Sequence, residues 1–297
     1  MPFEVLGQEG PTPLSKAAER GENPGMPDRA PIDQLAQVWR STAAACEDLS
    51  PEQWDTITDC PGWTVRDQLA HVIGTESVLL GRPSPDPAPA GLPHVHNPMG
   101  QMNEAWVDAR RQVPGDKVLA EFEEVTAARV AALEAMTDEE LEASTPSPVG
   151  EVPYATFMDV RVMDCWTHEQ DIRRALGRPG HLDGPAPEAA LDRLVSSFGY
   201  VVGKRVGPPD GTTLVLELAG PPASETRRVA VVMSDGRARP IEPPADPTVR
   251  ISTDSETYAC LATGRWTADH AVASGRVAFA GDEPLGRRVV GKMSITP

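Results

Sequence analysis

The sequence predicts a helical bundle followed by a small α+β domain. Apolar residues recur at helical spacing in successive segments up to about residue 206, and short β-branched segments replace them near residue 208. A chain of 297 residues is long enough for two domains that each bury a core. We therefore expect a flexible tail over residues 1–30, a helical domain over 31–207 and an α+β domain over 208–297.

Four predicted helices of the first domain have a start or stop signal of their own. Pro31 opens the first, Thr64 and Asp67 have the spacing of a capping box, and Asn97-Pro98 is typical of an N-cap followed by the first helical residue. Gly177, followed by Pro179, ends the longest helix. A proline-rich loop over 82–98 cannot be regular helix. The helices are expected over residues 31–49, 64–80, 97–110, 116–136, 155–176 and 187–206.

The second domain is predicted from short segments that alternate between strand and helix patterns. Residues 212–218 and 227–233 flank a Gly-Pro-Pro turn and predict a hairpin, and 249–252 and 276–280 add two strands. Helical patterns are expected over residues 255–263, 267–273 and 284–292.

Composition excludes several classes of partner. A formal net charge of −17 would repel a phosphate backbone, so we expect no nucleic-acid partner. No run of 18 apolar residues predicts a membrane span, and no secretory signal is evident at the N-terminus, so we expect a cytoplasmic protein that is a monomer or a weak oligomer. The four cysteines form no CxxC pair, which indicates reduced core residues rather than disulfides or a thiolate metal site.

Asp164 and His168 are the most informative pair in the chain. Residues four apart on a helix lie on one face, so this carboxylate and this imidazole can bind one metal ion. His71, from a different predicted helix, would complete a set of two histidines and one carboxylate. Such a set leaves coordination positions free for water, a thiol or a substrate. Asp171, three residues after His168, could orient the imidazole from behind.

Alternatives without a metal remain open for each of these residues. His71 lies among apolar residues, where a histidine is often a hydrogen-bonded core residue. The residues Arg161, Asp164, His168, Asp171 and Arg174 could form an ordinary solvated charged helix face.

His94 and His96 could form a loop metal site, but their proline-rich surroundings favour exposed loop residues. The sequence contains no GxGxxG, P-loop, GxSxG or HExxH motif, which excludes the common nucleotide and esterase interpretations.

Three segments resemble the mycothiol-dependent maleylpyruvate isomerase family. They are TDCPGWTVRDQLAH at residues 58–71, NPMGQMNE at 97–104 and DCWTHEQDIRRALG at 164–177. The resemblance covers roughly residues 30–206 and implies a DinB-like, metal-binding four-helix bundle. Gly264-Arg265 and residues 277–282 are similar to the small sterol-carrier-like domain that often follows this bundle.

The resemblance implies a divalent metal, usually zinc, at positions that correspond to His71, Asp164 and His168. The family pattern has glutamate where this chain has Asp164, a departure of one methylene. The resemblance also implies mycothiol as thiol cosubstrate, which adds to a maleylpyruvate-like substrate in the isomerase or attacks another small electrophile in S-transferase relatives. A thiol bound to such a metal is deprotonated.

Two further interpretations compete with this one. A non-catalytic, metal-stabilised binding or regulatory module would keep the three ligands and close the coordination sphere, for instance with His94 or His96. A non-haem iron enzyme would use the same ligand types. Arg265, Arg276, Arg287 and Arg288 are candidates for contact with a carboxylate substrate, and their spacing favours none of them.

Overall fold

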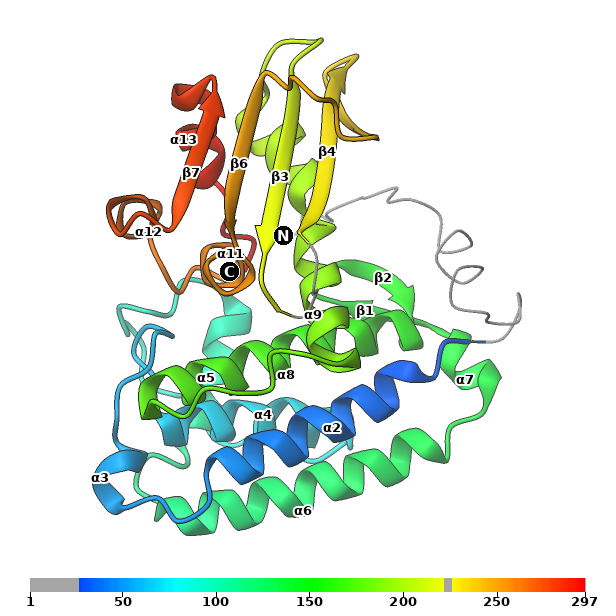
Figure 1. The fold of residues 1–297 in the computed structure, drawn as a ribbon. Helices are drawn as coiled ribbons and strands as arrows, with labels where there is room; N and C mark the ends of the chain where they lie inside the picture. The colour runs from blue at the N-terminus through cyan, green and yellow to red at the C-terminus, as the bar shows by residue number, and fades with distance from the viewer. Residues whose placement is uncertain (1–26, 222–225, 297) are drawn as a thin grey trace. The chain divides into compact units, whose positions relative to one another are not determined.

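The computed structural model describes residues 27–221 and 226–296 (Figure 1). Most of the predicted N-terminal tail, residues 1–26, lies outside the described residues. Contacts between Cα atoms divide the chain into two compact units. The first contains the chain up to Thr58 and Gly62–Gly180, and the second contains Asp59–Pro61 and His181–Pro297.

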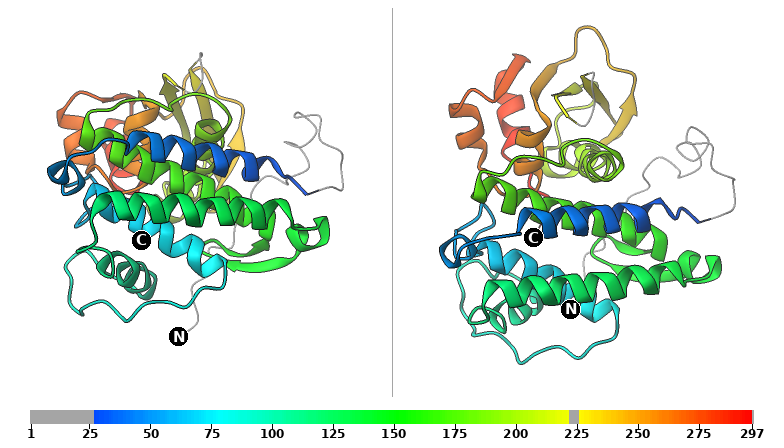
Figure 2. Two further views of the ribbon diagram at one scale, coloured as in Figure 1. Left: turned by 90° about the horizontal axis from the view of Figure 1, so that it is seen from below. Right: turned by 60° about the horizontal axis from the view of Figure 1, so that its bottom comes forward.

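Four long helices, α2, α4, α6 and α8, pack against one another in the first unit (Figures 1 and 2). Helix α2 contacts α6 and α8, α4 contacts the same two helices, and the shorter α5 packs on α4. This confirms a helical N-terminal part. The elements are α2 (Ala30–Ala45), α3 (Pro51–Trp54), α4 (Val65–Leu79), α5 (Pro98–Asp108), α6 (Gly115–Glu134), α7 (Asp138–Glu142), β1 (Ser144–Ser147), β2 (Gly150–Pro153) and α8 (Tyr154–Leu176).

The helices of this unit differ in what they bury. Helix α2 buries Leu35, Val38 and Trp39, and α6 buries Phe122 and other apolar residues at helical spacing. Burial of such side chains drives the packing of the helices. Helix α8, and to a lesser degree α4, also bury charged and polar side chains. Polar groups that leave water need partners inside the protein, and those partners form the site described below.

The predicted helix boundaries around the site are confirmed. The Thr64 side chain accepts a hydrogen bond from the backbone N–H of Asp67, and the Asp67 carboxylate accepts one from the N–H of Thr64. Asn97 caps α5 in the same way through the N–H of Gly100. Gly177 ends α8 at φ 62°, in the left-handed region that glycine adopts without strain.

Replacing Thr64 with alanine is expected to lower the free energy of unfolding by about 1 kcal/mol, because the first turn of α4 loses the acceptor for one of its free N–H groups. Urea unfolding measures this change. Thr64→Ser keeps the hydroxyl oxygen and should behave like the natural protein. Equal stability of the alanine and serine variants would show that the capping box contributes nothing.

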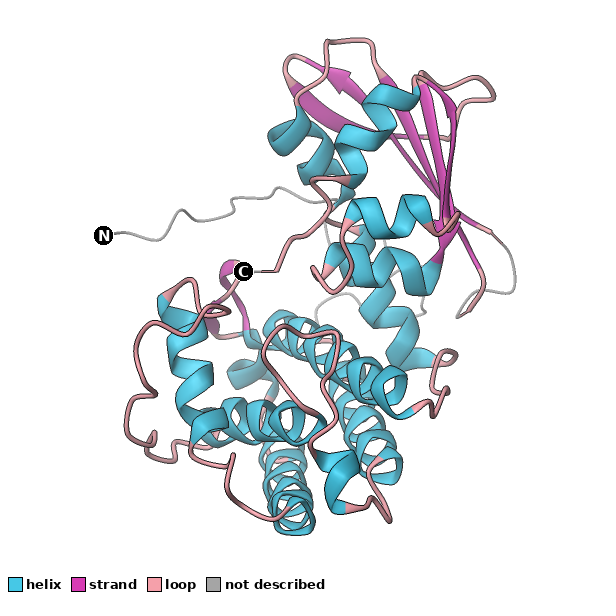
Figure 3. Ribbon diagram, turned by 90° about the vertical axis from the view of Figure 1, so that its left-hand side faces the viewer, coloured by secondary structure: helices cyan, strands magenta, loops and turns pink. Residues whose placement is uncertain are grey.

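The second unit is a five-stranded sheet with helices on one face (Figure 3). The strand order is β5-β4-β3-β6-β7, with β3 and β6 parallel and the other pairs antiparallel. Helices α11 and α13 pack on the sheet over Leu214, Leu216 and Ile251, which are fully buried. The elements are α9 (Pro185–Val195), α10 (Phe198–Tyr200), a π-helix (Val201–Val206), β3 (Thr213–Ala219), β4 (Arg227–Ser234), β5 (Arg237–Ile241), β6 (Val249–Asp254), α11 (Ser255–Ala262), α12 (Ala268–Ala273), β7 (Val277–Gly281) and α13 (Glu283–Val290).

The sequence-based expectation differs from the structure between residues 181 and 207. The expected helix over 187–206 is interrupted at Ser196 and Ser197, whose hydroxyls donate to the carbonyls of Arg193 and Leu194. The short helix α10 and then the π-helix follow this interruption. These residues group with the sheet, so the division between the units falls at residue 180 rather than near 207. Among the described helices, none is both long enough and apolar enough to cross a membrane.

Candidate metal centre

The three predicted metal ligands lie together inside the helical unit. His71 projects from α4, and Asp164 and His168 project from neighbouring turns of α8. His71 Nε2 lies 3.2 Å from one carboxylate oxygen of Asp164, and His168 Nε2 lies 3.6 Å from the other. One candidate ligand atom from each residue lies within 4.8 Å of the other two. The structure therefore brings together residues that are separated by up to 97 positions in the chain.

These separations fit a divalent metal of the size of zinc. Zinc binds nitrogen and oxygen ligands at about 2.0–2.2 Å, so two ligands of a tetrahedral site lie about 3.4 Å apart. The separations of the two Nε2 atoms from the Asp164 carboxylate, 3.2 Å for His71 to one oxygen and 3.6 Å for His168 to the other, lie close to that value. Two imidazoles and one carboxylate are also a ligand set that zinc and ferrous iron both accept. The residues present thus fit a metal both in chemistry and in spacing.

The protonation of the ligands suits a cation. Burial, helped by the nearby His168, lowers the pKa of His71 to about 4, so its imidazole is neutral at physiological pH. Burial opposes ionisation of Asp164, but Arg161 and His168 outweigh it and hold the pKa of this carboxyl well below its usual range. A neutral imidazole and an ionised carboxylate are the forms that bind metal.

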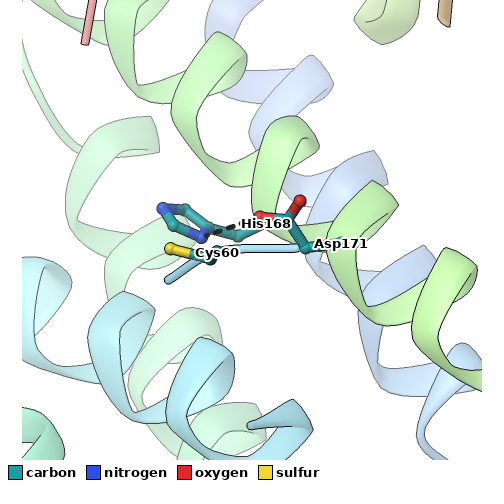
Figure 4. Close-up of side chains that lie close together, drawn as sticks. All are labelled: Cys60, His168 and Asp171. Atoms are coloured by element: carbon teal, nitrogen blue, oxygen red, sulfur yellow. Dashed lines mark ion pairs between the residues drawn. The ribbon is translucent and has the colours of Figure 1, made fainter. Parts of the chain in front are cut away.

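His168 is held from behind by two side chains. Its Nδ1 lies 2.5 Å from Gln68 Oε1 and 3.7 Å from an oxygen of Asp171, the ion pair drawn in Figure 4. Asp171 in turn accepts a hydrogen bond from Arg174 at 2.6 Å. Such partners fix the ring of a metal-binding histidine. The Nδ1 atom of His71, by contrast, is buried and has no hydrogen-bond partner among the described residues.

A buried network of charges holds Asp164 from its other side. Arg161 donates to Asp164 Oδ2 at 2.5 Å and, through Nε and a second amino group, to Glu76 Oε1 at 2.9 and 2.7 Å. Arg129 donates to the other oxygen of Glu76 at 3.0 Å and also bonds Tyr154. Glu76 is fully buried, and Arg129 and Arg161 are nearly so. The network combines residues from α4, α6 and α8 and fixes the carboxylate of Asp164.

Trp63 covers the two histidines. Its ring centroid lies 5.1 Å from that of His71 and 5.7 Å from that of His168. The indole N–H donates to Glu104 of α5 at 2.9 Å, and His94 Nε2 lies 3.0 Å from the same carboxylate oxygen. His94 is therefore a partner of Glu104. Among the described residues, neither His94 nor His96 belongs to a group that could hold a metal with His71, so the idea of a fourth ligand from this loop gains no support.

The alternative of a solvated charged face on this helix correctly predicts the ion pairs, but it wrongly predicts that their side chains are exposed to solvent. The pairs Arg161–Asp164, His168–Asp171 and Arg174–Asp171 all form. Their side chains are largely inside the protein, however, and Asp171 is completely buried. These residues therefore form the polar interior of the bundle around the site. The second-unit arginines Arg276 and Arg287 have acidic partners of their own: Asp254 and Glu256 for Arg276, and Glu283 for Arg287.

The cysteines of the helical unit are poor nucleophiles. Burial raises the pKa of Cys46 and of Cys165 to about 12, so both are thiols at physiological pH. Trp39 Nε1 lies 3.3 Å from the sulfur of Cys165 and donates to it. Neither cysteine takes part in a disulfide, and neither do the other two cysteines of the chain, Cys60 and Cys260. Neither Cys46 nor Cys165 therefore supplies a thiolate at physiological pH.

Three supporting residues were not predicted from the sequence: Gln68, Glu76 and Trp63. Gln68 lies one turn before His71 on α4, so its spacing could have indicated a partner for the site. Glu76 is five residues after His71, and its partners come from helices 53 and 85 residues away. No local pattern reports such pairs. Trp63 precedes a helix cap and is typical of a core residue in sequence.

The fold and the site together define a two-unit protein whose helical N-terminal part contains a candidate metal centre of two histidines and one aspartate. Residues 35–173 match the model of a known family, described as the mycothiol maleylpyruvate isomerase N-terminal domain. This part of the chain belongs to that family. The matched residues include all three candidate ligands.

Relatives and solved structures extend the comparison. The uncharacterized protein Rv0738 of Mycobacterium tuberculosis is 28% identical over 56% of this chain and 76% of its own length. A second, Rv0036c of the same organism, is 25% identical over 73% of this chain and 78% of its own length. A crystal structure of the mycothiol-dependent maleylpyruvate isomerase matches with a TM-score of 0.53 at 18% identity, over 84% of this chain and 91% of that one. This similarity shows that this chain and the isomerase share a fold. The sterol-carrier-like character of residues 208–297 stays a prediction.

Proposed function

We propose that the protein is a thiol-dependent enzyme of the maleylpyruvate isomerase type that uses mycothiol at a metal centre formed by His71, Asp164 and His168. The metal is most simply zinc, and the second substrate is a small electrophile. One observation carries the proposal: two imidazole nitrogens and a carboxylate from two helices converge at ligand spacing inside a domain of this family. The family supports a thiol-dependent isomerase, and this chain's own reaction is the proposed part.

Exposure of the site favours catalysis over a purely structural metal. The side chains of His71 and His168 are 6% and 7% exposed, whereas that of Asp164 is 29% exposed. The carboxylate is therefore the most accessible of the three candidate ligands. A bound divalent metal would supply positive charge that stabilises a thiolate at neutral pH. The chain's own residues hold the ligand set, keep it in the ionisation state that binds metal, and exclude water behind it.

Isomerisation and S-transfer would begin with the same thiolate and differ in its fate. In isomerisation the thiol adds to a double bond and is released again, so mycothiol is not consumed. In S-transfer the sulfur stays on the product, and one equivalent of thiol is lost per turnover. Measuring free thiol during turnover of a maleylpyruvate-like substrate distinguishes the two reactions. A metal-stabilised binding module would show neither, and metal analysis of anaerobically purified protein separates zinc from iron.

The central test is calorimetric titration of mycothiol into metal-loaded protein. We expect binding by the natural protein and no binding by a His168→Ala variant, because the metal loses one of three ligands. His96→Ala is the matched control: it removes an exposed histidine of the same unit that belongs to no candidate ligand group in the described residues. The control should bind mycothiol like the natural protein. Equal binding by the His168→Ala variant would refute a thiol held at this site.

A further inference from the structure

We infer that Glu104 is a positioning residue of the candidate metal centre: it holds Trp63 against the two histidines and, through His94, fastens the loop over residues 83–96 to that cover. The inference rests on the proposed metal site, because it concerns how the rings of two candidate ligands are kept in place. One oxygen of a single buried carboxylate is the junction. It bonds one side chain from the turn before α4 and another from the loop before α5.

The backbone on both sides of Trp63 has a fixed shape. Gly62 lies at φ 80°, a left-handed conformation that suits glycine, and Thr64 is the cap of α4. The carbonyl oxygen of Trp63 accepts a hydrogen bond from the N–H of Thr58 at 3.0 Å. These contacts leave open only the orientation of the indole ring about its own side-chain bonds.

Glu104 determines that orientation. The indole N–H of Trp63 donates to Glu104 Oε2 at 2.9 Å, and Trp63 is 8% exposed, so a ring turned the other way would bury its N–H without this acceptor. The other oxygen of Glu104 accepts a hydrogen bond from Arg111. This guanidinium compensates the charge of a carboxylate side chain that is only 1% exposed. Glu104 is thus held in place while it holds the indole.

The position of the indole affects the site because three rings pack on one another. The ring centroids of Trp63 lie 5.1 Å from that of His71 and 5.7 Å from that of His168, and the centroids of the two imidazoles are 4.5 Å apart. Protein interiors have little free volume, so an indole that turns must push against at least one imidazole. A metal site tolerates little rotation of its ligand rings. Glu104 therefore acts on the two histidines through Trp63.

His94 ties the loop to the same carboxylate. Across residues 83–96, all within the described part of the chain, only Ala88 is buried. His94 Nε2 nevertheless lies 3.0 Å from Glu104 Oε2, and the His94 side chain is only 16% exposed. Its ring also fills the space beside Gly62, where an added Cβ atom would come within 2.4 Å of Nδ1. The loop is thus fastened to the turn before α4.

A double-mutant cycle on zinc affinity, measured by competition with a chromophoric chelator, tests the action of Glu104 through Trp63. Glu104→Leu removes the acceptor, and Trp63→Phe keeps an aromatic ring but removes the N–H. Each is expected to weaken zinc binding about 10-fold, and the double variant should bind no more weakly than Trp63→Phe alone. Losses that multiply in the double variant would overturn the inference. Natural affinity in a folded Glu104→Leu protein would do the same.

Glu121→Leu is the matched control for the loss of a carboxylate that binds an arginine. Glu121 of α6 accepts hydrogen bonds of 2.5 and 2.9 Å from Arg110, which lies just after α5. In the described part of the chain it bonds to neither Trp63 nor His94. The variant should bind zinc like the natural protein. An equal loss of affinity in Glu121→Leu and Glu104→Leu would show a general disturbance of this region and refute the positioning role.

NMR of the natural, metal-free protein provides a test that needs no destabilised variant. The indole N–H of Trp63, identified by its absence from the Trp63→Phe spectrum, should exchange slowly with solvent because Glu104 holds it inside the protein. Glu104→Gln, a milder change than leucine, should shift this signal because the acceptor loses its charge. Fast exchange in the natural protein, or an unmoved signal in Glu104→Gln, would contradict the inference.

Amide hydrogen exchange followed by mass spectrometry tests the loop. Exchange over residues 83–96 should rise in His94→Ala and in Glu104→Leu, and it should stay natural in His96→Ala, which alters an exposed histidine of the same loop. Unchanged exchange in both His94→Ala and Glu104→Leu would overturn the tie to the loop. If the natural protein binds no zinc, the proposed function fails, and the indole and loop measurements still decide whether Glu104 holds Trp63 and the loop.

Discussion

Replacing Glu76 with glutamine is expected to lower the free energy of unfolding of the helical unit by about 3–5 kcal/mol, because two buried guanidinium groups lose their shared counter-charge. Arg129 and Arg161 are 2% and 5% exposed, and Glu76 is completely buried between them. Glutamine keeps the shape of the side chain, so the change reports charge rather than volume. A buried charge that loses its partner destabilises the protein by more than the intact ion pair stabilised it.

Urea unfolding followed by tryptophan fluorescence measures this change in the helical unit. Five of the six tryptophans lie there: Trp39, Trp54, Trp63, Trp106 and Trp166. The matched control is Glu124→Gln, which breaks an ion pair with Arg82 whose side chains are 72% and 38% exposed. An exposed pair contributes about 0–1 kcal/mol, so the control should unfold like the natural protein. Coinciding curves for the two variants would mean that the buried network adds no stability.

Replacing Asp164 with asparagine is expected to weaken zinc binding more than about 100-fold, a larger loss than for partners that only orient a ligand. The amide carries no charge to attract the cation, and Arg161 then lacks one of its two carboxylate partners. Asp164→Glu keeps a carboxylate on a side chain one methylene longer and should bind zinc. The comparison separates the need for a carboxylate from the need for this particular chain length.

Competition with a chelator measures the zinc affinities. Asp116→Asn is the control for the change in net charge, because the side chain of Asp116 on α6 is 70% exposed. Thermal unfolding of the metal-free proteins shows whether each variant is folded. A folded Asp164→Asn protein that keeps natural zinc affinity would exclude this carboxylate as a ligand and remove the centre as proposed.

Local signals were sufficient to predict the helices that carry the site. The capping box of Thr64 and Asp67 and the left-handed Gly177 are determined by neighbours within a few residues, and the structure shows both. The spacing of Asp164 and His168 places them on one face for the same reason. The convergence of His71 with them depended on which helices pack together, and the family resemblance rather than periodicity indicated it.

The features that were missed depend on contacts between distant parts of the chain. Strand β5 contains Pro240, and proline is confined to the edges of sheets; the strand forms because it pairs at the edge with β4. The hairpin of β1 and β2 is short and rich in small polar residues. In the sequence Glu76 is typical of an exposed helix residue, because nothing near it indicates its two buried partners, Arg129 and Arg161.

The burial of Cys46 and Cys165 has a consequence for the proposed reaction with a small electrophile. Alkylation requires a thiolate, and side chains with a pKa of about 12 supply almost none at neutral pH. Packing inside the bundle also keeps such reagents from either sulfur. Burial in the helical unit thus keeps these two thiols unreactive toward electrophiles at neutral pH.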